Sequence, residues 1–276
     1  MSAALNQAAR VPTAVHKLWR RFTPAQRAAR FSVYVFIVAA ILASARSVEI
    51  IPEFLYDAPE QMQDLFKRMW PIAFYHYPKG VHDALVDTLH IASLGTIMAV
   101  AMAVPIGLLA AHNVMPNRAV NYFAKLLLVS SRSVNSLVWA LLFVAVFGPG
   151  ALAGTLAIAF RSIGFVGKLL GEALEEAHAG PIEALEAAGA PWFSILSKGY
   201  WPQVAPAFWS VVLFRWDINV RESAVLGLVG AGGIGMALDT ALNLFQWDRV
   251  AMVLFSIFCV VVIAELVVTQ VRKRVI

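Results

Sequence analysis

The chain has 276 residues, of which 60% are hydrophobic and only 14% are charged, and its mean hydropathy is +0.71. This composition excludes a soluble globular domain, and recurring apolar runs predict an all-α polytopic membrane protein with about six transmembrane helices. The net charge of +5 does not indicate nucleic-acid binding, because the excess of basic residues lies at the two chain ends. A single cysteine excludes an intrachain disulfide and a multi-cysteine metal site.

The N-terminal part of the chain is basic. Residues 1–30 hold six Lys and Arg residues and no acid, and from Val15 to Phe31 these bases are mixed with apolar side chains. This pattern is typical of a helix at a membrane interface. We expect residues 1–30 to be a cytoplasmic interfacial segment and the apolar run 31–45 to be an uncleaved first transmembrane helix.

A second amphipathic pattern follows on the expected outer side of the membrane. Residues 31–82 would comprise the first span and this external segment, in which four apolar residues recur at helical spacing. These residues are Met62, Leu65, Phe66 and Met69. Interfacial anchoring is the simpler role for such a helix, and part of an external gate is the more specific one.

Residues 83–276 form the expected membrane core. Five further spans are predicted, at about 84–111, 121–147, 151–170, 203–229 and 249–270. The terminal bases then place both chain ends in the cytoplasm.

One polar stretch, residues 172–202, interrupts the apolar sequence. Gly180-Pro181 is typical of a helix start, apolar residues recur at helical spacing behind it, and Gly189 lies where a helix normally stops. We predict a short amphipathic helix at about 181–189, exposed on the cytoplasmic side. It could lie in a groove on a partner, although the periodicity fits a plain inter-helix loop equally well.

This stretch resembles the EAA loop of ABC-importer permeases, which reads EAA, three residues, Gly, nine residues and I-x-L-P. Four of seven positions match the motif and three depart from it. The matches are Glu183, Ala184, Gly189 and Pro202, and the departures are Leu185, Gly199 and Trp201. Residues 215–235 (RWDINVRESAVLGLVGAGGIG) and 107–113 (GLLAAHN) look like phosphonate-uptake permeases of the type I importer class.

The resemblance, which covers roughly residues 80–276, implies a type I importer permease fold with a coupling helix at 181–189. The residues implied in ATPase coupling are Glu183, Ala184, Glu186, Gly189 and Pro202. It also implies a homodimer in the bacterial inner membrane, two ATPase subunits that bind ATP and Mg, and an extracytoplasmic substrate-binding protein. The chain lacks GxxxxGK[ST], a nucleophile–base pair and a metal-ligand cluster, so we expect it to hold no cofactor and not to be an enzyme.

Polar side chains inside the predicted spans are functional candidates, because charges are costly there. In the third span Lys125, Leu128, Arg132, Asn135 and Ser136 are predicted to share one helical face, and in the fifth Arg215, Asn219 and Glu222 share another. Asp217 and Arg221, four residues apart, are predicted to form a self-neutralising structural pair.

These faces predict a translocation path for a small anion, whose hydration Arg and amide donors can replace. The candidate lining residues are Arg132, Asn135, Arg215, Asn219, Glu222 and Ser223. For any one of them, interhelical ion pairing or polar packing is an equally good alternative.

A glycine-rich segment follows the fifth span. Gly230, Gly232, Gly233 and Gly235 formally fit GxGxxG, but an apolar span precedes them in place of a short strand, so a dinucleotide site is not expected. We predict a tight turn or broken helix where backbones approach closely. The resemblance places this turn toward the outer side, near the path.

The sequence therefore predicts the transmembrane permease of an ATP-driven importer for phosphonates or related phosphorus oxyanions such as phosphite and hypophosphite. A permease for another solute, such as methionine or phosphate, is the nearer alternative. An ion-driven secondary transporter or intramembrane enzyme with Glu222 and Asp217 as proton carriers is the more distant one, because it leaves the polar cytoplasmic helix unexplained.

Overall fold

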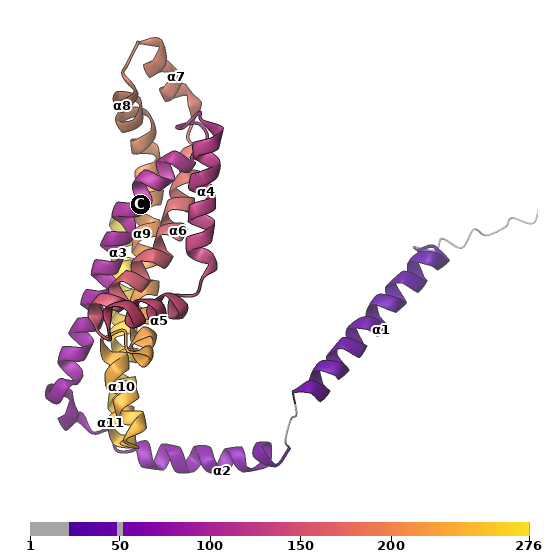
Figure 1. Ribbon diagram of the computed structural model, residues 1–276, viewed down its shortest axis with the longest axis vertical. Helices are drawn as coiled ribbons and strands as arrows, with labels where there is room; N and C mark the ends of the chain where they lie inside the picture. Colours follow the sequence, from indigo (N-terminus) through magenta and orange to yellow (C-terminus); the bar gives the residue numbers. More distant parts are fainter. Residues whose placement is uncertain (1–21, 49–51, 276) are drawn as a thin grey trace, which may run out of the picture. The chain divides into compact units, whose positions relative to one another are not determined.

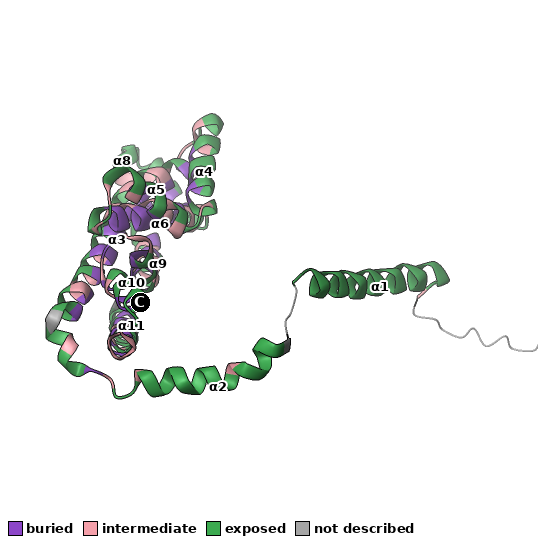
Figure 2. Ribbon diagram, turned by 60° about the horizontal axis from the view of Figure 1, so that its bottom comes forward, coloured by how far each residue is buried: buried purple, intermediate pink, exposed green. Residues whose placement is uncertain are grey.

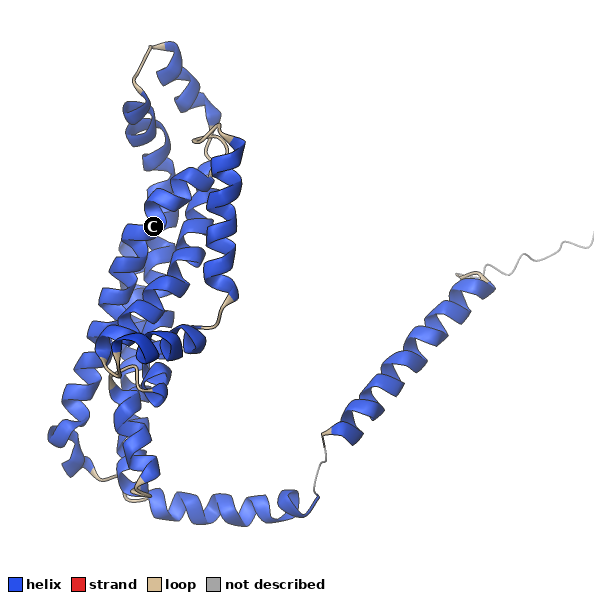
Figure 3. Ribbon diagram, in the orientation of Figure 1, coloured by secondary structure: helices blue, strands red, loops and turns tan. Residues whose placement is uncertain are grey.

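The computed structural model describes residues 22–48 and 52–275, and all regular structure within them is helical (Figure 3). The chain divides into two units, Met1–Gln61 and Met62–Ile276. Helix α2, Pro52–Met69, runs across the boundary and includes the four apolar residues whose spacing predicted a helix.

In the first unit, α1 spans Pro24–Ser47 without a break. It begins at a capping box, in which the Thr23 side chain accepts from the Gln26 backbone while the Gln26 side chain accepts from the Thr23 backbone. Its 24 residues reach about 36 Å, enough to cross the hydrocarbon core. The predicted interfacial helix lies partly outside the described residues, and its portion from Pro24 onward is continuous with the first span.

The second unit is a bundle of helices (Figure 1). Its elements after α2 are η1 Phe74–His76, η2 Tyr77–Val81, α3 His82–Ala110, α4 Arg118–Ser133, α5 Ser136–Phe147, α6 Ala151–Glu175, α7 Ala179–Ala187, α8 Trp192–Ser194, η3 Ile195–Tyr200, α9 Trp201–Leu226, η4 Gly227–Val229, α10 Ile234–Asn243 and α11 Trp247–Val275. Within the described residues, α1, α3, α6 and α11 are each long and apolar enough to span a membrane, and the total reaches six if each of two bent helix pairs forms one span. Six spans were predicted.

The bundle is built around α6, which packs against α3, α4, α5 and α9. Buried residues concentrate in the bundle, whereas α1 is exposed along its length (Figure 2). Small residues on α6 allow the close packing. A Cβ atom on Gly167 would lie 2.6 Å from the Leu128 side chain, and one on Gly164 would overlap the Leu128 carbonyl.

The third predicted span is not one straight helix. α4 and α5 meet at an 88° bend, so Lys125, Leu128 and Arg132 do not share a helical face with Asn135 and Ser136, and that prediction was wrong. The cause is local, because Asn135 is extended and its side chain accepts from the Leu137 backbone at 3.1 Å, which starts a new helix.

The close approach of α4 to α6 predicts that Gly164→Ala destabilises the protein by about 1–3 kcal/mol through overpacking. Gly180→Ala is the matched control, because a Cβ there meets nothing within 4 Å and Ala favours a helix. Thermal unfolding in one detergent should show a lower midpoint for Gly164→Ala alone. Equal midpoints would mean that α4 and α6 are not packed this closely.

Candidate functional site

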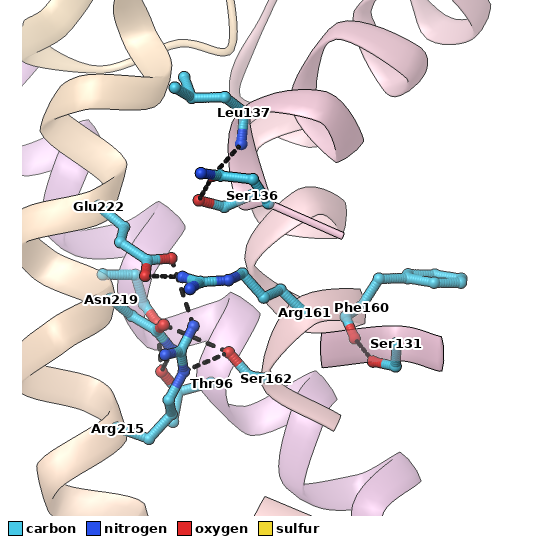
Figure 4. Close-up of polar contacts among 12 residues, drawn as sticks. Thr96, Ser131, Ser136, Leu137, Phe160, Arg161, Ser162, Arg215, Asn219 and Glu222 are labelled. Atoms are coloured by element: carbon cyan, nitrogen blue, oxygen red, sulfur yellow. Dashed lines mark hydrogen bonds and ion pairs between the residues drawn. The ribbon is translucent and has the colours of Figure 1, made fainter. Parts of the chain in front are cut away.

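A group of polar side chains lies between the middle of α3, the middle of α6 and the C-terminal half of α9 (Figure 4). We call it the polar cluster. Its members are Thr96 on α3, Arg161 and Ser162 on α6, and Arg215, Asn219 and Glu222 on α9. Polar groups inside membrane-spanning segments are shielded from water, so each of them needs a partner.

Glu222 is shared by two guanidiniums. Arg215 Nη2 lies 3.3 Å from Glu222 Oε2, and Arg161 Nη1 pairs with Glu222 Oε1. The three residues carry two positive charges and one negative charge, so the polar cluster retains a net charge of +1. Such a site attracts an anion more strongly than a neutral pair does.

A chain of hydrogen bonds fixes the inner end of the polar cluster. Arg215 Nε donates to Ser162 Oγ at 2.8 Å, and Ser162 Oγ donates to Asn219 Oδ1 at 3.2 Å. Asn219 Nδ2 then donates to Thr96 Oγ1 at 2.8 Å, and Thr96 donates to the Ala92 carbonyl at 2.6 Å. Every hydroxyl accepts one bond and donates one, so α3, α6 and α9 are joined without an unsatisfied group.

The predicted path residues fall into different places. The structure brings Arg215, Asn219 and Glu222 together. The Ser223 hydroxyl makes its contacts outside the polar cluster, since it donates to the Val220 carbonyl at 2.9 Å and lies 3.3 Å from the Thr88 carbonyl. Ser223 therefore joins α9 to α3 beside the glycine-rich turn.

Arg132 and Asn135 lie at the bend of the third span and outside the polar cluster. Arg132 is exposed at the end of α4, and among the described residues its side chain has no hydrogen bond or ion pair. The Asn135 side chain caps the N-terminus of α5 by accepting from the Leu137 backbone. Lys125, farther back on α4, pairs with Glu175 at 3.1 Å.

Arg161 was missed in the sequence analysis. The predicted candidates lie in the third and fifth spans, whereas Arg161 lies in the fourth, where it is the one charged residue from Ala151 to Gly167. A charge inside a predicted membrane span is the general signal that could have identified it.

Asp217 and Arg221 pair with each other, as predicted. The pair is separate from the polar cluster, and neither residue contributes to the hydrogen-bond chain of Arg215 and Asn219.

The glycine-rich segment forms a tight turn between η4 and α10. Gly230, Gly232 and Gly233 have φ values of +84°, +86° and +72°, which favour glycine. The backbones also approach closely, since a Cβ on Gly227 would lie 2.5 Å from Gly235 Cα. The Ile234 backbone donates to Thr88 Oγ1 at 2.7 Å, which ties the turn to α3.

Helix α7, Ala179–Ala187, lies within two residues of the predicted cytoplasmic helix at each end. Gly189 follows it with φ +72° and reverses the chain. The predicted coupling residues Glu183, Ala184, Glu186, Gly189 and Pro202 are all exposed. Ile182 is buried, and Gln203 holds the start of the helix by accepting from the His178 backbone at 2.9 Å.

Two residues that depart from the EAA motif, Leu185 and Gly199, lie next to each other. A Cβ on Gly199 would lie 3.2 Å from Leu185 Cδ1. Leu185, which is larger than the Ala of the motif, therefore fills space that Gly199, which is smaller than the Ile of the motif, leaves open. The two departures compensate each other in volume, and α7 packs on η3 through this contact.

Residues 103–276 match the family described as binding-protein-dependent transport system inner membrane component. The chain is also 40% identical over 190 residues to the phosphite transport system permease protein PtxC of Stutzerimonas stutzeri, which covers 69% of each chain. The chain belongs to this family. It is thus a multi-pass membrane component of a binding-protein-dependent transport system.

Another relative of this transport family is the phosphate-import permease protein PhnE of Mycolicibacterium smegmatis, 37% identical over 234 residues. The match covers 85% of this chain but only 44% of that protein. The fold is that of importer permeases. A chain of the inward-facing MetNI methionine ABC transporter superposes with a TM-score of 0.64 at 20% identity, over 71% of this chain and 96% of that one. A chain of an alginate importer gives 0.60 at 15% identity, over 88% and 99%.

Because Glu222 is shared by two arginines, a Glu→Gln substitution should lower the stability of the protein more at Glu222 than at Glu172. Glu222→Gln leaves Arg161 and Arg215 without their counter-ion, and should destabilise the protein by about 3–5 kcal/mol. Glu172→Gln removes a half-exposed i,i+4 partner of Lys168 and should cost at most ~1 kcal/mol. Unfolding midpoints measured under one condition test this difference, and similar losses for both variants would contradict it.

The contact between Leu185 and Gly199 predicts a compensating pair. Gly199→Ile should destabilise the protein by about 1–3 kcal/mol, because the new side chain needs the space of Leu185. Adding Leu185→Ala should recover much of that loss. A double-mutant cycle of unfolding free energies measures the interaction, and additive effects would show that the two positions do not share space.

Proposed function

We propose that this chain is the membrane-spanning permease of an ATP-driven importer for phosphonates or related phosphorus oxyanions, including phosphite and hypophosphite. The observation that carries the proposal is the polar cluster, where the guanidiniums of Arg161 and Arg215 share the carboxylate of Glu222 inside the predicted membrane spans. Guanidinium groups bind phosphoryl oxygens in pairs and can replace the water that an oxyanion loses. The relatives named as phosphite and phosphate permeases support this substrate class.

The proposed assembly contains a second copy of this chain, two ATPase subunits and an extracytoplasmic binding protein, in the bacterial inner membrane. ATP and Mg are bound by the ATPase subunits, so hydrolysis takes place outside this chain. Residues 1–30 and both termini would lie in the cytoplasm. Residues 31–82 would supply the first span and the external helix, and 83–276 the permease core.

In this proposal α7 is the coupling helix. The exposed side chains Glu183, Ala184 and Glu186 would contact a groove on the ATPase, and Gly189 would allow the sharp exit from it. Because α7 is packed on η3 and η3 continues into α9 at Trp201-Pro202, closure of the ATPase dimer would move α9 as a rigid body. That movement would turn the spans from inward-open to outward-open.

The path residues would have separate tasks. Arg215 and Asn219 hold α9 against α3 and α6, and Ser223 supports the glycine-rich turn at Gly230, Gly232, Gly233 and Gly235. Arg132 and Asn135 stand at the bend of the third span. A few dispersed donors suit transport, because the anion must also leave.

Phosphate is the second candidate substrate, since one relative at 37% identity is named a phosphate-import permease. Phosphate presents the same oxygens to guanidinium groups as a phosphonate, so the polar cluster does not separate the two. Relatives named as D-methionine permeases are 28% identical, which makes methionine a weaker candidate.

Uptake of radiolabelled methylphosphonate into cells that express this chain with its ATPase and binding protein tests the proposal. We expect uptake that depends on this chain and that unlabelled phosphonate or phosphite blocks and methionine does not. Stronger competition by phosphate would favour the second candidate. No chain-dependent uptake in cells where the complex assembles would contradict the proposed substrate class.

A further inference from the structure

The two arginines that share Glu222 are held differently. Arg215 is 4% exposed and is fixed by two partners, Ser162 and Glu222. The Arg161 side chain is 30% exposed, and among the described residues Glu222 is its one hydrogen-bonding partner. Of the two guanidiniums, Arg161 is therefore the one that can leave the polar cluster.

We propose that Arg161 receives the permeating oxyanion and that Glu222 is its exchangeable counter-ion. This inference rests on the proposed function and assigns its substrate site. When the anion arrives, the Arg161 guanidinium moves from a carboxylate oxygen of Glu222 to a phosphoryl oxygen. One charge-assisted hydrogen bond is thus replaced by another of the same kind. Arg215 keeps its place and maintains the contacts between helices.

The exchange leaves no charge unpaired. When Arg161 turns away, Glu222 still has Arg215 at 3.3 Å, and Arg161 has the anion. An exchange that orphaned one of these buried charges would be far more costly. Glu222 also competes with the substrate for Arg161, which weakens binding and so favours release.

A second cation stands close to Arg161 along α6. The backbone of Arg132 lies against Gly164, one helical turn from Arg161, because a Cβ on Gly164 would be 3.0 Å from Arg132 N. The Ser131 hydroxyl bonds the Phe160 carbonyl at the same level (Figure 4). The end of α4 thus places the backbone of Arg132 one turn of α6 from Arg161, and the Arg132 side chain is exposed and has no partner among the described residues.

Arg132 adds a positive charge for which no carboxylate among the described residues competes, whereas the charge of Arg161 is shared with Glu222. Arg132 is the penultimate residue of α4, just before the bend to α5.

The test uses the whole complex in proteoliposomes with saturating, substrate-loaded binding protein. Radiolabelled phosphite uptake and ATP hydrolysis are measured together for wild type, Arg161→Gln, Arg161→Lys and Lys168→Gln. Losing the contacts of Arg161 should lower uptake per ATP by about tenfold or more, and Lys should restore part of it. Lys168→Gln removes a charge of the same helix outside the polar cluster, and its partner Glu172 is half-exposed, so this variant should stay near wild type.

A substitution at Glu222 should change phosphite affinity in the opposite direction to the Arg161 substitutions. In the Glu222→Asp variant the shorter side chain keeps a negative charge for Arg215 and is not expected to reach Arg161 as well. Arg161 is then free to bind the anion. The variant should therefore bind phosphite more tightly than wild type in equilibrium measurements without ATP. A general structural defect would weaken binding in both the Arg161 and Glu222 variants. Weaker binding in Glu222→Asp, or wild-type uptake per ATP in Arg161→Gln, would overturn the inference.

Uptake by the wild-type complex distinguishes a failure of this inference from a failure of the proposed function. Wild-type phosphite uptake together with an unaffected Arg161→Gln variant rejects the Arg161 site and keeps the importer. Absence of phosphite, phosphonate and phosphate uptake by the wild-type complex rejects the proposed substrate class itself, and the site with it.

Discussion

A charge among membrane-spanning helices needs a partner within the protein, and in this chain two guanidiniums share one carboxylate. Glu222 lies between Arg161 on α6 and Arg215 on α9, so its position fixes how these helices meet. The hydrogen-bond chain through Ser162, Asn219 and Thr96 extends the same constraint to α3. Removing Glu222 would leave two guanidiniums uncompensated in a medium of low dielectric constant, whereas removing either arginine would leave Glu222 paired with the other.

Close backbone packing makes this arrangement possible. Gly164 and Gly167 let α4 lie directly on α6, and Gly227 and Gly235 let the chain fold back at the end of α9. Without a hydrophobic driving force between helices in lipid, such contacts supply much of the packing energy. They also leave α6, which carries Arg161 and Ser162, in contact with α3 and α9, which carry the other members of the polar cluster.

The proposed coupling helix is mechanically connected to the same region. Helix α7 is seated on η3 through Ile182 and Leu185 and is held at its start by Gln203. η3 runs directly into α9, which carries Arg215 and Glu222. A force on α7 would therefore reach the shared carboxylate through continuous helix and packed side chains. A bistable arrangement of α9 against α6 would then link ATPase closure to the exchange at Arg161.

The sequence by itself determined the all-helical class, the apolar segments and the short polar helix, because apolar length, capping residues and Gly-Pro signals act over a few neighbouring residues. It also identified the pairing of Asp217 with Arg221, which are one helical turn apart. A local signal for the bend existed at Asn135, but the long apolar run around it favoured a single span.

Only the tertiary structure decided which polar residues meet. Arg161 and Glu222 are 61 residues apart, and Asn219 and Thr96 are 123 apart. Their contacts depend on which faces of α3, α6 and α9 pack together, and on the glycines that set the distance between helices. Periodicity places a residue on a face of its own helix, but the partner of that face is chosen by packing among all the helices at once.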